Sequence, residues 1–279
     1  MSITPFNVPI IPRLKRETFL SLLKKGVRLD KRRLNQFRPI TIEYGVATKA
    51  HGSALVSIGN TKVLVGVKIE PGRPFPDLPE EGVLNVNAEL VPLASPEFEP
   101  GPPDENAIEL ARVVDRALRE TPVLDTSQLV LIPGEKVWVV WVDIYVLDHD
   151  GNLFDAAMLA SMAALLNAKI PEHEVKEDGT VEITGPPTYP LPIINKVVSV
   201  TLGVIDDSFI VDPNLEEENI IDGKVFFAFD EAGNVVGIQK SGPAWIDFKK
   251  VQVGFNIARS LYQHPLKILL SSLEGPKTQ

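Results

Sequence analysis

Three arginines at helical spacing are the side chains of this chain best suited to hold phosphate. Arg112, Arg116 and Arg119 lie in the segment EPGPPDENAIELARVVDRALR. A guanidinium is a planar fork of donors that matches phosphate oxygens, and like charges four residues apart repel by roughly 0.2–0.5 kcal/mol. A phosphate chain is one partner that would offset this repulsion. The alternative is a solvated face on which Glu109 and Asp115 neutralise the arginines, and the spacing alone favours that alternative.

The residues around the arginines predict the helix that positions them. Pro102 and Pro103 end any preceding regular structure, Asp104 is a suitable N-cap, and Glu105 lies in the first turn, where the helix dipole favours an acid. At about 100° per residue, one apolar stripe forms and should face the core; it contains Ala107, Leu110, Ala111, Val114 and Leu118. We therefore expect the three arginines on the opposite, exposed side.

Composition limits the function classes. The chain has 279 residues, 44% of them hydrophobic, a net charge of −9 and no cysteine. The missing thiols exclude disulfides, thiolate zinc sites and cysteine nucleophiles. An acidic chain attracts nucleic acid poorly as a whole, so any RNA binding must be local or shared with a more basic partner. We find no secretory signal and no apolar run long enough to span a membrane, and we expect a cytoplasmic protein.

Local positive charge is concentrated near the N-terminus. The run consists of Arg13, Lys15, Arg16, Lys24, Lys25, Arg28, Lys31, Arg32 and Arg33. Such a run is most often a solvated helix and loop, and we interpret it in that way.

Hydrophobic periodicity predicts two units built of strands followed by helices. Strands are predicted over Ile40–Tyr44, Ser53–Ile58, Lys62–Ile69, Val83–Leu93, Lys136–Leu147, Val197–Ile205, Phe209–Asp212, Lys224–Asp230 and Val235–Lys240. Besides the arginine helix, helices are predicted near Lys15–Lys25, over Phe154–Leu166 and about Phe248–Tyr262, while the tail after His264 is helical or loose. The fold class is α+β. Predicted boundaries are 1–27 for a helical extension, 28–170 and 196–279 for the units, and 171–195 for a linker with a small hairpin.

One carboxylate lies inside the most apolar predicted strand. Both faces of Lys136–Leu147 are apolar, so we expect a central strand buried on both sides. Asp143 then has two interpretations: a structural carboxylate held by buried hydrogen bonds, or a base with a raised pKa. Because buried polar groups normally have partners, the structural interpretation is favoured.

Metal-binding patterns are weak. The four histidines, His51, His149, His173 and His264, have no ligand spacing, so we predict no histidine metal site. An acidic group could hold Mg²⁺ through its carboxylates; it contains Asp206, Asp207, Asp212, Glu216, Glu217 and Glu218. A solvated loop explains the same residues, and spacing favours the loop.

Several motifs in order resemble the RNase PH family. The segment RLDKR at 28–32 resembles its R-x-D-G-R, with lysine in place of glycine; GSALV at 52–56 and GNTKVL at 59–64 resemble its hairpin; VDPNLEE at 211–217 resembles its D-P-x-x-E-E segment. The resemblance runs from about Arg28 to Arg259. It implies an RNase PH-like fold of two related sheet-plus-helix subdomains.

Within the family, the arginine-helix segment is most similar to the non-catalytic RNase PH-like subunits of the archaeal exosome. This resemblance implies a hexameric ring of three heterodimers with a catalytic sister, together with RNA-binding cap subunits. Such a ring degrades single-stranded RNA from the 3′ end, with inorganic phosphate as nucleophile. The catalytic partner would use that phosphate, with Mg²⁺ as a candidate ion, and this chain would need no cofactor and no metal. Arg112 and Arg116 would point across the heterodimer interface toward the RNA, with Arg119 one turn further on.

Departures from the catalytic pattern point away from chemistry in this chain. Active members carry Gly-Ser-Arg or Gly-Thr-Arg as a phosphate cradle, whereas this sequence has Asn152-Leu153-Phe154. Asp212 and Glu218 match the paired acids of active members, but an acidic pair without a cradle is not a working site. Active members also carry arginines just before the long helix, where this chain has acidic residues.

Three functions remain open. The first is a non-catalytic ring subunit that structures the sister's active site and holds the RNA backbone, with no catalytic residue of its own. The second is an autonomous phosphorolytic exoribonuclease that uses Asp212 and Glu218. The third is an architectural ring component that never touches RNA.

Overall fold

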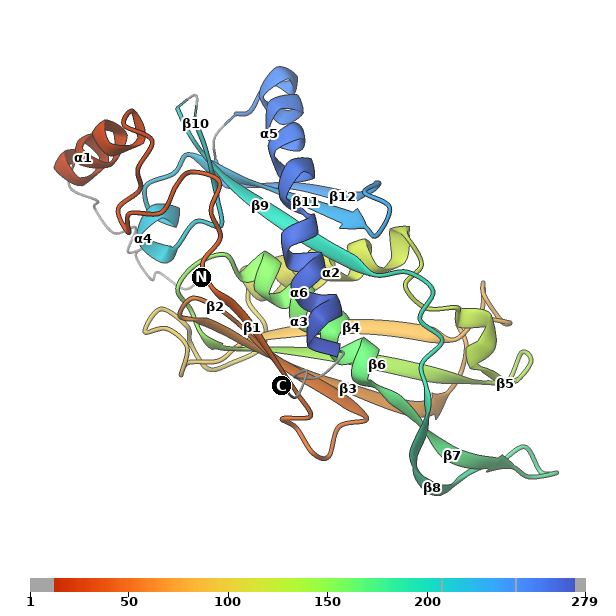
Figure 1. Cartoon of the computed structure of the whole chain (residues 1–279). Coiled ribbons are helices and arrows are strands. Elements are labelled where there is room, and N and C mark those ends of the chain that lie inside the picture. The colour runs from red at the N-terminus through yellow and green to blue at the C-terminus, as the bar shows by residue number, and fades with distance from the viewer. Residues whose placement is uncertain (1–12, 207, 244, 274–279) are drawn as a thin grey trace, which may run out of the picture.

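The computed structural model describes residues 13–206, 208–243 and 245–273, with side chains of the first helix from Arg16 onward. Two β-sheets lie on either side of a helical layer (Figure 1). Residues 1–12 of the predicted extension 1–27, and Asp207 of the predicted acidic group, lie outside the described residues. No helix in the described part of the chain is long and apolar enough to cross a membrane.

The first sheet has six strands in the order β1-β2-β3-β6-β4, with β5 paired to β6. Their bounds are β1 Ile40–Tyr44, β2 Gly52–Ile58, β3 Thr61–Gly72, β4 Val83–Leu90, β5 Val130–Ile132 and β6 Lys136–Asp148. Only β4 runs parallel to its neighbour, β6, because helical and loop segments separate the two in sequence. The predicted strand end at Leu93 was wrong: β4 ends three residues earlier, and Leu93 is exposed.

The second sheet has four antiparallel strands in the order β10-β9-β11-β12. Their bounds are β9 Val197–Ile205, β10 Ser208–Val211, β11 Gly223–Asp230 and β12 Val235–Ser241. A separate hairpin consists of β7 (Lys169–Val175) and β8 (Val181–Pro190). It follows the first sheet and precedes the second in sequence, and it extends away from the body of the molecule (Figure 1). The hairpin predicted in this segment is therefore present.

Helix α3 (Leu153–Asn167) forms the centre of the molecule and contacts both sheets. Twelve of its residues are buried, and a helix that is apolar all round has to be enclosed. Gly52 of β2 packs closely where this helix ends: a Cβ there would lie 2.5 Å from the Cα of Ala168, the C-cap residue. Helix α2 (Glu105–Glu120) lies beside α3 and contacts β4 of one sheet and β12 of the other.

The remaining helices lie at the periphery. They are α1 (Arg13–Leu23), the 3₁₀ turn Thr126–Leu129, α4 (Leu215–Glu218), α5 (Phe248–Leu261) and α6 (Gln263–Leu273). Helix α5 covers the second sheet on the side away from α3, and Gly254 packs against Phe209 and Leu202 there. The tail after His264, which the sequence left open, is helical.

The prediction that β6 is buried on both faces was wrong. Its inner face is buried, from Trp138 to Val146, but Tyr145 on the other face is 39% exposed. Asp143 shares this outer face and accepts a hydrogen bond from the Asn87 amide at 3.2 Å. The carboxylate is therefore half-buried beside an edge strand, and neither a buried structural group nor an enclosed base describes it.

Candidate functional site

Helix α2 presents its arginines to solvent, as the 3.6-residue period predicted. The Asp104 carboxylate caps the helix by accepting a hydrogen bond from the backbone NH of Ala107 at 2.8 Å. The buried face contains Ala107, Leu110, Val113, Val114, Ala117 and Leu118. Val113 and Ala117 were missing from the predicted stripe, and Ala111, which was included, is half-buried.

The three arginines have different surroundings. Arg112 makes no hydrogen bond or ion pair with any residue in the described part of the chain. Arg119 is ion-paired with Asp115 at 2.8 Å and also donates to the carbonyl oxygen of Leu84. Neutralisation by an acid, which was the alternative interpretation of all three, thus applies to Arg119.

Arg116 is held by the second sheet. Its Nη2 donates to Oε1 of Gln239 on β12 at 2.7 Å. The other end of that amide, Nε2, donates to Oε1 of Glu109 at 3.0 Å, and the Ser241 hydroxyl donates to Oε2 of Glu109 at 3.3 Å. Two residues of β12 and one of α2 therefore fix the guanidinium on the exposed side of the helix.

The turn before α3 carries apolar side chains at the positions where the sequence resemblance assigns a phosphate cradle to active family members. Gly151 and Asn152 have positive φ, 83° and 54°, and so reverse the chain into the helix. Phe154 is buried and packs edge-on against Phe226 with ring centroids 5.7 Å apart. The Lys224 ammonium lies 5.5 Å from the Phe154 ring centroid. The side chains of Leu153 and Phe154 offer no donor to an anion.

A cavity of about 220 Å³ opens beside this turn. Its wall includes Leu153, Phe154, His149 and Glu218. His149 stacks on Phe98 at 5.4 Å, and burial lowers the pKa of the imidazole. Oε1 of Glu218 accepts from the backbone NH of Asn152 at 2.9 Å and from Lys224 at 3.0 Å. Glu218 is thus engaged as a structural acceptor.

Asp212 is enclosed by arginines and cannot serve as a free carboxylate. It is fully buried and accepts five hydrogen bonds. Arg38 donates three of them, from its backbone NH at 2.8 Å, Nε at 3.0 Å and Nη2 at 2.8 Å. Arg32 donates from Nη1 at 3.0 Å and Asn152 from Nδ2 at 2.7 Å. An acceptor with this many donors is poorly placed to bind a cation.

The interpretation of the N-terminal basic run as solvated was wrong for Arg28 and Arg32. Arg28 is 1% exposed and forms a bidentate ion pair with the buried Glu217. Both arginines contact the predicted acidic group. The prediction that this group is a solvated loop was therefore wrong for Asp212 and Glu217, which are buried. Within the described residues, no three histidine, aspartate or glutamate side chains are grouped to hold a metal ion.

Sequence reasoning missed Asp155 and Arg38. Asp155 is buried in α3 and accepts hydrogen bonds from Ser199, Thr201 and Asn152, while burial raises the pKa of its carboxyl. Arg38 follows the basic run that was singled out and carries no local signal. Asp155 could have been noticed as the one acid in an otherwise apolar helix.

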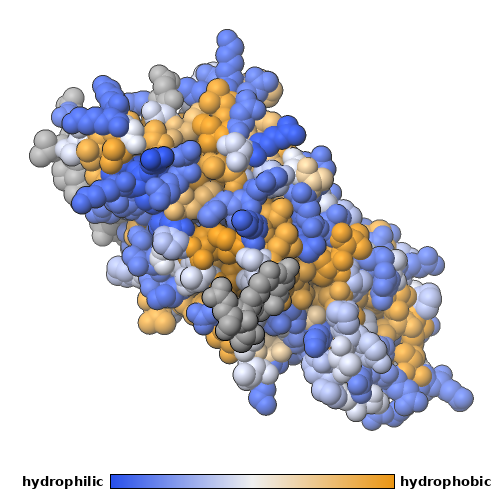
Figure 2. All heavy atoms as spheres, in the orientation of Figure 1, coloured by the Kyte–Doolittle hydropathy of each residue, from blue (hydrophilic) through white to orange (hydrophobic). Residues whose placement is uncertain are grey.

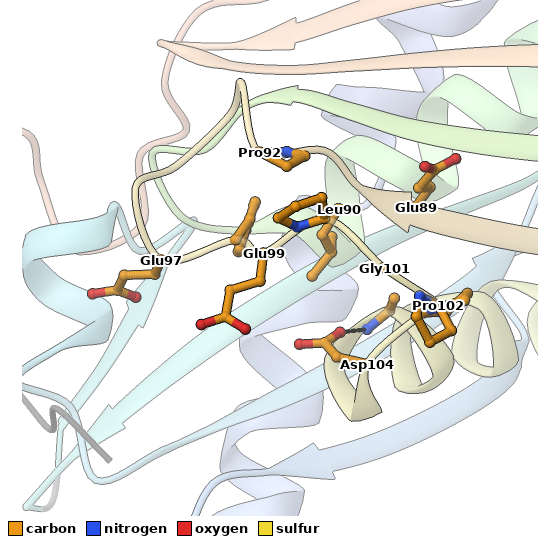
Figure 3. Close-up of a pocket in the computed structure, with 12 residues that line it drawn as sticks. Glu89, Leu90, Pro92, Glu97, Glu99, Gly101, Pro102 and Asp104 are labelled. Carbon is orange, nitrogen blue, oxygen red and sulfur yellow. Dashed lines mark hydrogen bonds between the residues drawn. The ribbon is translucent and has the colours of Figure 1, made fainter. Parts of the chain in front are cut away.

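The acidic stretch before α2 lines a second cavity, of about 300 Å³ (Figure 3). The carboxylates of Glu97, Glu99 and Asp104 lie on its wall, with Glu89 of β4 across from them. Four acids at one cavity repel a phosphate backbone. This geometry supports the expectation that the segment before α2 does not bind RNA.

Comparisons with known proteins identify relatives over nearly the whole chain. The model of the 3′ exoribonuclease family (RNase PH), domain 1, matches residues 36–171, and that of domain 2 matches residues 195–259. These ranges do not fix the predicted unit boundaries, which stay a prediction. The exosome complex component Rrp42 of Aeropyrum pernix is 55% identical over 87% of this chain and 88% of its own length. That of Sulfurisphaera tokodaii is 51% identical, with 94% and 96% covered.

Solved exosome chains have the same architecture. A chain of the Archaeoglobus fulgidus exosome with RNA bound to the active site is 46% identical, with a TM-score of 0.83, and the match covers 91% of this chain and 97% of that one. A chain of an archaeal exosome core is 42% identical, with a TM-score of 0.80, over 91% and 96% of the two chains.

Proposed function

The chain belongs to the RNase PH family of 3′ exoribonucleases, and we propose that it is the non-catalytic ring subunit of a phosphorolytic 3′–5′ RNA-degrading exosome. The predicted family and the predicted RNase PH-like α+β fold are confirmed. In this role the chain structures the catalytic sister's active site and holds the RNA backbone. It would perform no phosphorolysis alone.

The contrast between two groups of arginines carries the proposal. Arg28, Arg32 and Arg38 are buried against carboxylates, whereas Arg112 and Arg116 on α2 face solvent. The arginines near Asp212 that could neutralise phosphate are thus already ion-paired with Asp212 and Glu217. Arg112 and Arg116 are accessible on a helix surface, where they can reach RNA bound elsewhere. Contacts of this kind bind the backbone without reading sequence.

The apolar turn at Leu153 and Phe154 supports the absence of catalysis. Phosphoryl transfer is accelerated mainly by positioning and by neutralising charge on the reacting oxygens. Leu153 and Phe154 supply neither function, and the Asp212 carboxylate is held by Arg32, Arg38 and Asn152. The competing function, an autonomous exoribonuclease using Asp212 and Glu218, would need both carboxylates released from their present donors.

The proposed partners follow from the family. We place this chain in three heterodimers with a catalytic RNase PH-like sister, capped by RNA-binding subunits, with single-stranded RNA as substrate. Inorganic phosphate, with Mg²⁺ as the candidate ion, would act in the sister's site. Large apolar side chains are exposed and available for contact with other subunits: Trp245 is 90%, Leu93 82% and Phe248 74% exposed. Apolar patches are visible between hydrophilic regions in Figure 2.

Activity of the separated chain tests the proposal. The purified chain, its catalytic sister and the assembled ring are each mixed with RNA and inorganic phosphate, and nucleoside diphosphate release is followed. We expect release by the ring and only background release by this chain alone. A rate for the chain alone that approaches that of the ring would overturn the proposal.

Crosslinking separates the RNA-holding role from a purely architectural one. RNA carrying photoreactive groups is bound to a ring that is blocked in turnover by omitting phosphate. We expect crosslinks on α2 of this chain. A fully active ring whose RNA crosslinks only to other subunits would leave the architectural function in place.

A further inference from the structure

Gln239 connects the second sheet to the exposed arginine face of α2. Its side-chain oxygen accepts from Arg116 at 2.7 Å, and its side-chain nitrogen donates to Glu109 at 3.0 Å. Glu109 is in turn anchored by the Ser241 hydroxyl, also on β12. Glu109, Gln239 and Arg116 thus form a hydrogen-bonded chain. It leads from a half-buried acid to an exposed cation.

We propose that Gln239 is a positioning residue for RNA: it holds the Arg116 guanidinium in the orientation that binds a backbone phosphate. This inference rests on the proposed function, because it presupposes that Arg116 contacts RNA. One of the five N–H donors of the guanidinium is used by Gln239, and the others remain for phosphate oxygens. Arg116 and Gln239 also border a cavity of about 190 Å³ between α2 and β12, which leaves the guanidinium accessible.

Gln239 is suited neither to read the RNA sequence nor to neutralise phosphate. Both ends of its amide are already engaged, so it has no free group aimed at a base and does not read sequence. A glutamine is also uncharged, so it does not itself neutralise phosphate. Gln239 instead restricts the motion of the Arg116 side chain. A free arginine loses side-chain entropy when it binds phosphate, and an arginine already held by a neighbour loses less.

Arg112 provides the internal comparison. It lies one turn before Arg116 on the same exposed side, but it makes no hydrogen bond or ion pair with the described residues. If Gln239 orders only Arg116, then loss of Gln239 should matter in the presence of Arg116 and should be without effect in its absence. The contribution of Arg112 to RNA binding should not depend on Gln239.

A double-mutant cycle in the assembled ring tests this coupling. The variants are Gln239→Met, Arg116→Ala and both together, with Gln239→Asn as a polar side chain too short to reach Arg116. Exposed Gln252→Met on α5 is the matched control. The readouts are the dissociation constant for single-stranded RNA without phosphate, then KM and kcat with phosphate.

We expect Gln239→Met and Gln239→Asn to weaken RNA binding about three- to tenfold and to raise KM with kcat nearly unchanged. In the Arg116→Ala background, Gln239→Met should add nothing. A purely structural role would lower the melting temperature and leave the RNA affinity and KM of the folded ring unchanged. Equal and independent losses in both backgrounds would overturn the coupling.

The outcomes separate this inference from the proposed function. If Arg116→Ala weakens RNA binding but both Gln239 variants bind RNA as the parent does, only the positioning role fails. If Arg116→Ala together with Arg112→Ala leaves RNA binding unchanged, the RNA-holding function itself fails, and the positioning role fails with it.

Discussion

Arg38 donates three hydrogen bonds to the single carboxylate of Asp212, from its backbone NH, Nε and Nη2, all within 3.0 Å. The two residues are 174 positions apart and join the first sheet's leading segment to the second unit. The Asp212 carboxylate is therefore a structural anchor between the two units.

Asp212→Ala should destabilise the fold strongly. Removing one partner of a buried ion pair leaves uncompensated charge and costs about 3–5 kcal/mol. Asp206→Ala is a matched control, since Asp206 and Asp212 both have positive φ, 47° and 50°, so alanine is strained at each. The Asp206 side chain is 60% exposed and pairs with Arg16 at 3.4 Å. Urea denaturation should show a loss several-fold larger at 212, and similar losses at both positions would contradict the anchor.

Replacing Arg112 and Arg116 by alanine should reduce the salt dependence of RNA binding by the ring. Each phosphate contact on a single strand contributes about 0.7 to the slope of log K against log salt, so two contacts predict a decrease of about 1.4. Lys267→Ala, an exposed cation on α6, is the control. Charge reversal, Arg112→Glu with Arg116→Glu, should further weaken binding and degradation while the hexamer still elutes as one species. An unchanged slope would mean that these arginines are only a solvated face.

Restoring the cradle sequence should not restore chemistry to the isolated chain. The substitutions are Asn152→Gly, Leu153→Ser and Phe154→Arg. Arg32 and Arg38 would still hold Asp212, and loss of the buried Phe154 packing should destabilise the chain by about 3–5 kcal/mol. We expect no nucleoside diphosphate from the grafted chain with RNA and phosphate. Turnover by the graft would show that the apolar turn alone had silenced the site.

Local periodicity was sufficient for most elements and for the exposed arginine face. The α2 stripe follows from spacing within sixteen residues, and the strands follow from alternation and β-branched runs. These signals are carried by residues close in sequence. They place Arg112, Arg116 and Arg119 on one exposed side without any knowledge of the rest of the fold.

The contacts that could not be predicted from the sequence are those between residues far apart along the chain. Charged residues are normally exposed, so burial of Arg28 is unexpected until Glu217, 189 residues later, is brought against it. The Arg116–Gln239 contact spans 123 residues for the same reason. The prediction for the outer face of β6 was wrong for another reason. Its apolar residues suit a buried face, but the described residues leave Tyr145 39% exposed.

His149 should make the fold sensitive to mild acid. Burial lowers the pKa of its imidazole below the ordinary value of 6.5, so between the folded-state pKa and 6.5 the unfolded chain binds a proton that the native state does not. The free energy of unfolding therefore falls as pH drops below 6.5 and regains its full value above it. His149→Phe keeps a ring to stack on Phe98 but cannot titrate. The difference in unfolding free energy between parent and variant should be constant from pH 8 to pH 7 and should shift in favour of the variant toward pH 5. A difference independent of pH would mean that His149 titrates alike in both states.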